Sequence, residues 1–145
     1  MDSGRWKDID EMKKFVGDYS KNMYGEKWKL GLSLSFKWSY REFKYLENWM
    51  DKLKLYMLGS VGVVLFDGIY VGEYNRNGDL GLHSVLYYEG DVNDSKVKNS
   101  LYKWCVNKGS VDIFEFKEDE GFDWYMNKHL YRGFENNWNM INNKI

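Results

Sequence analysis

The chain has 145 residues, a net charge of −1 and 43% hydrophobic residues, which together fit a single folded domain with its own core. A chain so close to neutral has no overall electrostatic attraction for nucleic acid, so any such contact would need a local basic face. The single cysteine, Cys105, excludes an internal disulfide and indicates a reducing compartment, and neither a signal peptide nor a long apolar run indicates a membrane.

Four residue types, Ala, Pro, Thr and Gln, do not occur in the sequence. All four depend on cytosine at the first or second codon position. Their absence therefore indicates a cytosine-poor coding strand, which is typical of a small replicon such as a virus or plasmid. It also means that helices form here without alanine, the strongest helix former.

The first half of the chain predicts a helix, a strand and a second helix. Residues 8–24 carry apolar side chains at three- and four-residue spacing, which is the pattern of an amphipathic helix. Residues 29–38 alternate apolar and polar side chains, as a half-buried strand does. Ser39 with Glu42 three residues later forms a capping box, which predicts a helix from there to about Tyr56.

The second half predicts a three-stranded meander and then a helix, a strand and a helix. Asp67-Gly68 is a tight-turn signal, so it separates two of the meander strands. The strands of the meander are expected at residues 60–66, 69–74 and 80–88. The later elements are expected at residues 94–107, 110–116 and 118–131. The Asn-rich tail after Gly133 is expected to pack poorly, with Phe134 and Trp138 as its possible anchors.

This order of elements predicts an α+β fold, in which helices are stacked on one face of an antiparallel β-sheet. Right-handed crossovers would give a split β-α-β (ferredoxin-like) core with an extra N-terminal helix. The expected divisions are an N-terminal helical extension at 1–28, the main domain at 29–133 and a C-terminal tail at 134–145. Because this fold supports many functions, the function must be argued from particular residues.

Four polar residues stand where a reactive site could form. Glu73 ends one predicted strand, His83 lies inside the next, and Tyr125 and Lys128 lie three apart on the last helix. Carboxylate and imidazole groups bind metals, and a tyrosine can act as a nucleophile beside a lysine. Each residue also has an ordinary structural reading: a packed histidine, a solvated carboxylate, a packed tyrosine and a solvated lysine. His129 lies one residue away from the Lys128 position and reads as a bystander.

From about Lys29 to Gly133, these residues in this order resemble the HUH endonuclease superfamily. The resemblance is strongest to the small Rep-like rolling-circle replication initiators of viruses and plasmids, including archaeal ones. The family has a hydrophobic first strand, here Leu32 to Trp38, and a glutamate followed on the next strand by a histidine, here Glu73 and His83. Its Tyr-x-x-Lys motif is matched by Tyr125 and Lys128. A second histidine or glutamine belongs two residues after the first, where this chain has Val85, which cannot bind metal.

The resemblance implies a metal-dependent endodeoxyribonuclease and DNA strand transferase that nicks and joins single-stranded DNA. Tyr125 would be the nucleophile and would form a 5′-phosphotyrosine intermediate, while Lys128 would counter negative charge. Glu73 and His83 would hold Mn²⁺ or Mg²⁺, with waters in the remaining positions. A free 3′-hydroxyl would then prime rolling-circle replication.

Single-stranded DNA would lie on the sheet, with Lys37 near its backbone and its bases on aromatic side chains such as Trp38 and Tyr87. Two groups of basic residues could form the local basic face: Lys37, Arg41, Lys44, Lys52 and Lys54, and Lys96, Lys98, Lys103 and Lys108. The chain has no ATPase motif, so it would depend on a host or viral helicase or polymerase in the host cytoplasm.

Two other functions stay open. One is a catalytically inactive single-stranded nucleic-acid binding protein on the same fold, which Val85 favours. The other is a viral structural or host-interaction protein, in which the aromatic residues serve only as core.

Overall fold

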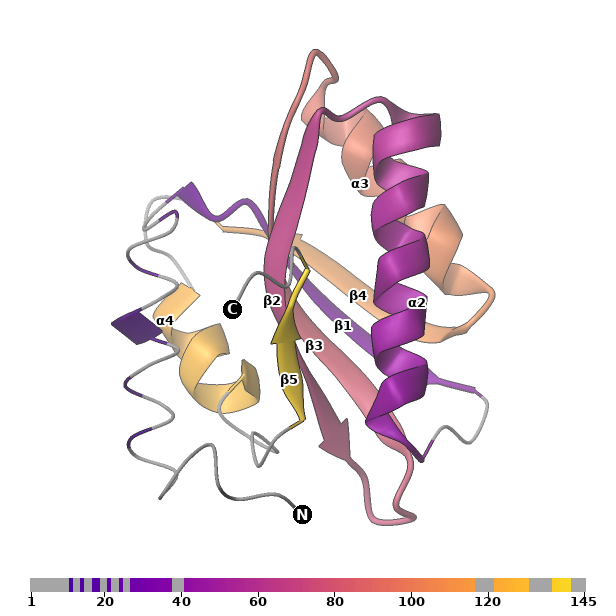
Figure 1. Ribbon diagram of the computed structural model, residues 1–145, viewed down its shortest axis with the longest axis vertical. Coiled ribbons are helices and arrows are strands. Elements are labelled where there is room, and N and C mark those ends of the chain that lie inside the picture. The colour runs from indigo at the N-terminus through magenta and orange to yellow at the C-terminus, as the bar shows by residue number, and fades with distance from the viewer. Residues whose placement is uncertain are drawn as a thin grey trace.

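The computed structural model describes residues 27–37, 41–116, 122–130 and 137–141, together with Glu11, Lys14, Gly17, Asp18, Lys21 and Tyr24. Its strands are β1 (Leu30–Phe36), β2 (Leu65–Tyr74), β3 (Leu80–Glu89), β4 (Gly109–Glu115) and β5 (Trp138–Met140). Its helices are α2 (Phe43–Tyr56), which runs on into the wider turn η2 (Met57–Val61), α3 (Asp94–Val106), and α4 (Phe122–Tyr125), which runs on into η3 (Met126–Leu130). Figure 1 shows these elements.

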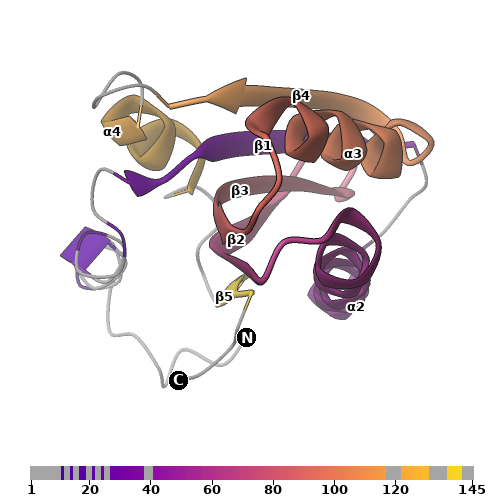
Figure 2. The same cartoon turned by 90° about the horizontal axis from the view of Figure 1, so that it is seen from above.

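The strands form one antiparallel sheet in the order β4-β1-β3-β2-β5. Helix α2 joins β1 to β2, and α3 joins β3 to β4, so the first four strands make the expected split β-α-β core. The predicted α+β fold is confirmed. The expectation that all helices share one face is wrong for α4, which lies across the sheet from α2 and α3 (Figures 1 and 2).

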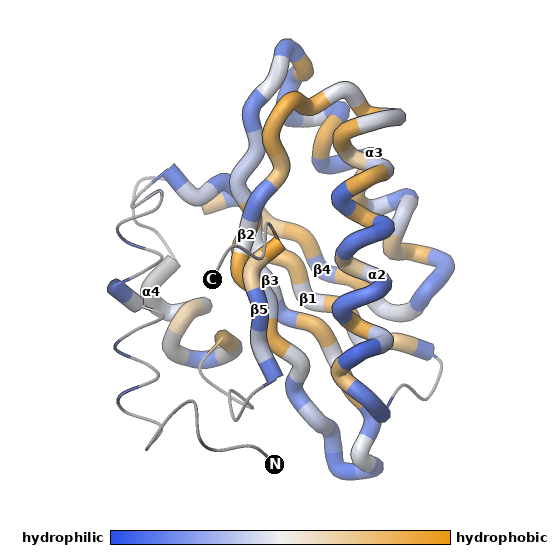
Figure 3. Tube along the Cα trace, in the orientation of Figure 1, coloured by the Kyte–Doolittle hydropathy of each residue, from blue (hydrophilic) through white to orange (hydrophobic). Residues whose placement is uncertain are grey.

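Both faces of the sheet are covered because successive side chains on a strand point to opposite sides. On one face, Leu32 and Leu82 pack with Leu46 and Leu53 of α2 and with Leu101 of α3. Cys105 belongs to the same cluster, as expected, and burial raises the pKa of its thiol to about 12. Because α2 buries only one of its faces, hydrophobic and hydrophilic residues alternate along it, as the tube coloured by hydropathy shows (Figure 3).

The second face carries its own hydrophobic cluster. Ile69, Val71 and Val85 of the sheet pack against Tyr125 and Leu130 from the α4 and η3 segment. All five side chains are buried. This second layer is what brings the last helix of the chain onto the sheet, and it determines the surroundings of the candidate site.

The predicted turn at Asp67-Gly68 is wrong, because β2 runs through both residues without a break. The Asp67 carboxylate is buried and accepts hydrogen bonds from the Tyr24 hydroxyl and the Gly68 N–H, both at 2.7 Å. At Gly68 an added Cβ would lie 2.3 Å from the Val85 carbonyl oxygen. Asp67 therefore takes part in buried hydrogen bonds, and Gly68 allows β2 and β3 to approach closely. In place of the predicted three-stranded meander, β2 and β3 form a two-stranded hairpin.

The segment before β2 also differs from the prediction. Residues 57–61, part of which was expected to be a strand, continue α2 as a wider helical turn that ends at Gly62 with φ of +97°. Helix α2 begins after Glu42 without a side-chain cap, and Ser39 lies outside the described residues. Helix α3 begins as predicted, with the Asn93 side chain accepting from the Lys96 N–H at 2.8 Å.

Described residues of the N-terminal extension and of the C-terminal tail also contact the sheet, the former through Tyr24. Trp138 to Met140 pairs with β2 as an added strand, so the expectation of a poorly packed tail is wrong there, while Phe134 lies outside the described residues. In the N-terminal extension the described residues Glu11 to Lys21 are helical, in line with the expected helix. Within the described part of the chain, no helix is long and apolar enough to cross a membrane.

Replacement of Gly68 by alanine tests the continuous strand. We expect Gly68→Ala to lower the free energy of unfolding by about 1–3 kcal/mol, because its methyl group would overlap the Val85 carbonyl. Gly59→Ala is the matched control, since its added methyl would meet no atom within 4 Å, and a change of less than about 1 kcal/mol is expected. Urea unfolding followed by circular dichroism measures both. Equal stability of the two variants would contradict the strand assignment.

Candidate functional site

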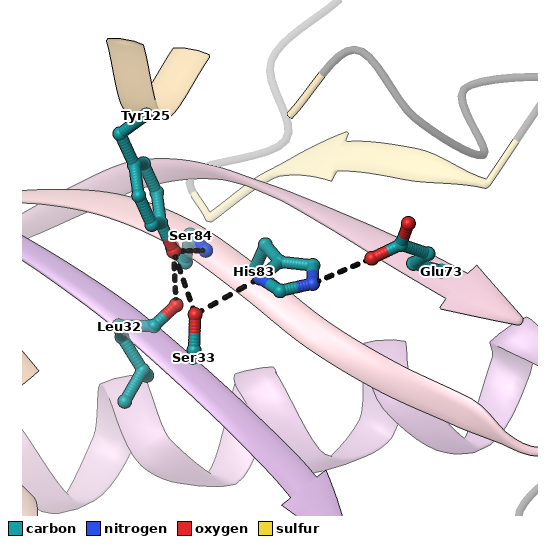
Figure 4. Close-up of polar contacts among 6 residues, drawn as sticks. All are labelled: Leu32, Ser33, Glu73, His83, Ser84 and Tyr125. Atoms are coloured by element: carbon teal, nitrogen blue, oxygen red, sulfur yellow. Dashed lines mark hydrogen bonds and ion pairs between the residues drawn. The ribbon is translucent and has the colours of Figure 1, made fainter. Parts of the chain in front are cut away.

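Glu73 and His83 lie side by side on the face of the sheet that α4 covers. Glu73 is opposite Gly81 and His83 is opposite Val71, so the two are diagonal neighbours on β2 and β3. His83 Nε2 is 2.8 Å from Glu73 Oε1, as Figure 4 shows. The structure thus brings together two of the residues that the sequence singled out.

A third residue, Ser33, links this pair to the last helix. Ser33 stands opposite His83 on β1, and its Oγ is 2.9 Å from His83 Nδ1. Because both ring nitrogens have partners, the imidazole has a defined orientation. Sequence reasoning missed Ser33, since only the pairing register of β1 with β3 places it beside His83.

Tyr125 lies at the other end of this chain of polar contacts. Its hydroxyl donates to the Leu32 carbonyl at 2.5 Å and accepts from the Ser84 N–H at 3.1 Å. The same oxygen is 3.5 Å from Ser33 Oγ. Leu32 and Ser84 are paired residues of β1 and β3, so the phenol oxygen bridges two neighbouring strands at this point (Figure 4).

The Tyr125 side chain is 0% exposed, and it is held as a neutral phenol. Burial raises the pKa of its hydroxyl well above the usual value, although the contacts with Ser33 and Ser84 act in the opposite direction. The rings of Phe114 and Phe116 pack edge-on against it. An attack by Tyr125 would therefore require both loss of the proton and a movement that exposes the oxygen.

Glu73 and His83 can be reached from solvent. Their side chains are 25% and 15% exposed, and both line a shallow cavity of about 220 Å³ together with Ser35, Asn75 and Gly81. The side chains of Glu73 and His83 are thus accessible to solvent, whereas the Tyr125 hydroxyl is not. Any substrate would meet the carboxylate and the imidazole first.

The metal implied by the resemblance can be tested against these donor atoms. An ion about 2.1 Å from each of two adjacent ligands would hold them about 3 Å apart, close to the 2.8 Å between Nε2 and Oε1. Ser33 Oγ can accept a hydrogen bond from Nδ1–H, which would fix the tautomer whose Nε2 carries no proton and can bind metal. The pair therefore fits two positions of a Mg²⁺ or Mn²⁺ ion.

The third ligand position contributes no donor. Val85 lies on the same face of β3 as His83, and it is 0% exposed in the cluster that contains Tyr125. Among the described residues there is no group of three His, Cys, Asp or Glu side chains arranged to hold a metal. An ion at Glu73 and His83 would consequently depend on water or on a substrate phosphate for its other positions.

Lys128, the second residue of the Tyr-x-x-Lys pattern, is exposed. Its Nζ lies 4.6 Å from the centre of the Trp124 ring, one turn back on the same helical segment. Tyr125 is buried three residues earlier, so the two side chains have different surroundings. The described contacts from Glu73 to Tyr125 run through Ser33 and do not include Lys128.

The expected DNA-contacting residues are dispersed. The Tyr87 ring is largely buried and stacks on Tyr24 at 4.0 Å, so this face is already occupied in the fold. Lys37 is exposed just after β1, and its backbone N–H donates to the Lys108 carbonyl. Trp38 and the side chain of His129 lie outside the described residues.

Removal of the Tyr125 hydroxyl tests its structural role. We expect Tyr125→Phe to lower the free energy of unfolding by about 1–3 kcal/mol, because the Ser84 N–H and the Leu32 carbonyl would lose their buried partner. Tyr102→Phe is the control, since Tyr102 is 49% exposed and should change stability by less than about 0.5 kcal/mol. Chemical unfolding compares the two, and equal effects would contradict the role.

Comparison with known protein families, curated proteins and solved structures gives no match to this chain. The functional assignment therefore depends on the chemistry of the site: two accessible ligand atoms, an orienting serine and a buried tyrosine on one face of an antiparallel sheet.

Proposed function

We propose that this chain is a metal-dependent endonuclease that nicks and joins single-stranded DNA, with Tyr125 as nucleophile, and that it initiates replication of a virus or plasmid in the cytoplasm of a host cell. The observation that best supports the proposal is convergence. Glu73, His83 and Tyr125 come from three separate elements, yet they lie on one face of the sheet: Glu73 contacts His83, and Ser33 contacts both His83 and Tyr125.

In this proposal Glu73 and His83 hold the ion and Ser33 orients the imidazole. A bound Mg²⁺ or Mn²⁺ would polarise the scissile phosphate and favour in-line attack. With Nδ1–H donating to Ser33, the Ser33 hydroxyl proton is free to point toward Tyr125. The serine thereby connects the tautomer of His83 to the hydrogen bonding of the Tyr125 hydroxyl.

Tyr125 carries the covalent step. Once the hydroxyl has left its buried position between Leu32 and Ser84, its proton goes to solvent and a phenolate remains. The oxygen then forms a bond to phosphorus, the bond from phosphorus to the 3′-oxygen breaks, and the leaving oxygen takes up a proton. The products are a 5′-phosphotyrosine and a free 3′-hydroxyl, and the reverse attack rejoins the strand.

The step requires an opening motion. The phenol oxygen must leave Leu32 and Ser84 before it can reach a phosphate at the cavity beside Glu73 and His83. This motion of the α4 and η3 segment would precede chemistry, as lid movements do in many enzymes. Lys128 would counter the charge on phosphorus only after the same motion.

A second function is favoured by one observation, the burial of Tyr125 beside Val85. A phenol that is part of the core and a ligand position filled by methyl groups are what a non-catalytic descendant of such a nuclease would have. The alternative is a single-stranded nucleic-acid binding protein on the same fold. A covalent adduct distinguishes the two.

The first activity test uses a pool of single-stranded oligonucleotides with Mn²⁺, with Mg²⁺ or with EDTA. We expect a covalent protein–DNA adduct with either metal, none in EDTA, and none from duplex DNA. Tyr125→Phe should abolish the adduct and leave strand binding within a few-fold, while Tyr102→Phe should keep it. Denaturing gels and mass spectrometry of the attached residue provide the readout. An adduct on another tyrosine would refute Tyr125, and binding without any adduct would support the second function.

A second test adds a ligand at the position where the metal-binding motif departs from the family pattern. Val85→His should raise Mn²⁺ affinity by about tenfold, or about 1.4 kcal/mol, because Val85 shares the His83 face of β3. Titration calorimetry measures the affinity, Val85→Leu serves as the control without a ligand atom, and urea unfolding verifies that each variant is folded. No gain in a folded Val85→His protein would argue against an ion at Glu73 and His83.

A further inference from the structure

A second and larger cleft lies on the opposite face of the sheet, between α2 and α3. Its volume is about 490 Å³, within the usual range of about 300–1,000 Å³ for ligand pockets. Leu46 of α2 is among its lining residues and belongs to the hydrophobic cluster of that face, whereas Glu73 and His83 face the other side. Figures 1 and 2 show the two helices that form its walls.

The charge of this cleft is one-sided. Lys52 comes from α2, Lys103 from α3 and Lys108 from the turn before β4. Among the described residues that line it, none is an aspartate or glutamate. None of the three lysines forms an ion pair with a described residue. Three lysines from separate segments, brought together without a counter-charge, suit an anionic ligand.

The walls of the cleft are aromatic as well as basic. Trp49 of α2 and Trp104 of α3 both line it, and the indole N–H of each is buried without a hydrogen-bond partner among the described residues. A buried donor without an acceptor is unfavourable, so a ligand that brings acceptor atoms to these indoles would be favoured. Nucleotides combine phosphates, many acceptor atoms and a flat base that packs on aromatic rings.

The cleft borders the cavity of the candidate site at the end of the sheet. Phe36, the last residue of β1, and Leu80, the first residue of β3, line both this cleft and the cavity at Glu73 and His83. The two openings therefore share an edge. A strand that leaves one could pass over Phe36 and Leu80 and enter the other.

We infer that the cleft between α2 and α3 binds the single-stranded DNA that flanks the scissile phosphate. The phosphates contact Lys52, Lys103 and Lys108, and bases pack against Trp49 and Trp104. The identity of the strand as substrate rests on the proposed function. The binding itself needs neither the metal pair nor Tyr125.

The test is the salt dependence of binding, measured in EDTA so that cleavage plays no part. A fluorescent single strand of about ten nucleotides is titrated with protein at several salt concentrations, and anisotropy reports binding. Each of Lys52→Gln, Lys103→Gln and Lys108→Gln should weaken binding several-fold and reduce the slope of log affinity against log salt by about 0.7. Lys21→Gln, an exposed change in the N-terminal extension and outside both groups of basic residues, is the control and should change neither quantity.

Direct location comes from ultraviolet cross-linking of the same strand, followed by mass spectrometry. Cross-links to peptides that contain Trp49 or Trp104 would support the cleft. Unchanged slopes in all three lysine variants, losses equal to that of Lys21→Gln, or cross-links confined to the other face would overturn it. Full competition by free thymidine monophosphate would also overturn it, because the ligand would then be a single nucleotide.

The outcomes separate the two proposals. Lysine-dependent binding by a protein that never forms an adduct would support the proposed DNA-binding cleft and refute the proposed nuclease activity. An adduct on Tyr125 in a protein whose lysine variants bind normally would keep the nuclease and remove the cleft.

Discussion

The placement of the Tyr125 hydroxyl between β1 and β3 is the constraint on which the second face of the sheet depends. By donating to Leu32 and accepting from Ser84, it adds a hydrogen bond to a buried backbone group on each of two neighbouring strands. It also fixes where the last helix sits, because Tyr125 is the largest side chain of that segment in the buried cluster. Ser33 and His83 then lie between the phenol and the surface, and their contacts with each other and with Glu73 follow from the register of three strands.

The buried position of the Tyr125 hydroxyl stabilises the fold but lowers its reactivity as a nucleophile. A nucleophile should be exposed and easily deprotonated, whereas this phenol is buried and its pKa is raised. Val85 repeats the conflict beside Glu73 and His83, since its methyl groups strengthen the apolar cluster at a position where the resemblance implies a ligand. The cost of chemistry at such a site would be the free energy needed to open it. Functional sites that run against local packing are common when the rest of the fold is stable enough to tolerate them.

The alternating leucines of β1 and the apolar spacing in α3 were sufficient to predict those two elements, because each places its apolar side chains on one face. The pair of Glu73 and His83 was predictable for the same reason, since neighbouring strands of a hairpin carry them. Asp67-Gly68 was not, because a turn signal is local and the carboxylate's partner, Tyr24, is 43 residues away. Ser33 and β5 were missed on similar grounds: the pairing of β1 with β3 and of β2 with the chain end is long-range.

Strand β1 connects the two faces in a way that no single residue of the sequence reveals. Its side chains alternate, so Ser33 points to the histidine while Leu32 enters the opposite core, and Phe36 at its end borders both cavities. The Leu32 carbonyl that accepts the hydrogen bond of the Tyr125 hydroxyl belongs to this same strand. A ligand that moved Phe36 would act on a short, fully paired strand, bonded to β3 on one side and β4 on the other. The cleft, the cavity at Glu73 and His83, and the Tyr125 hydroxyl therefore all contact this one strand.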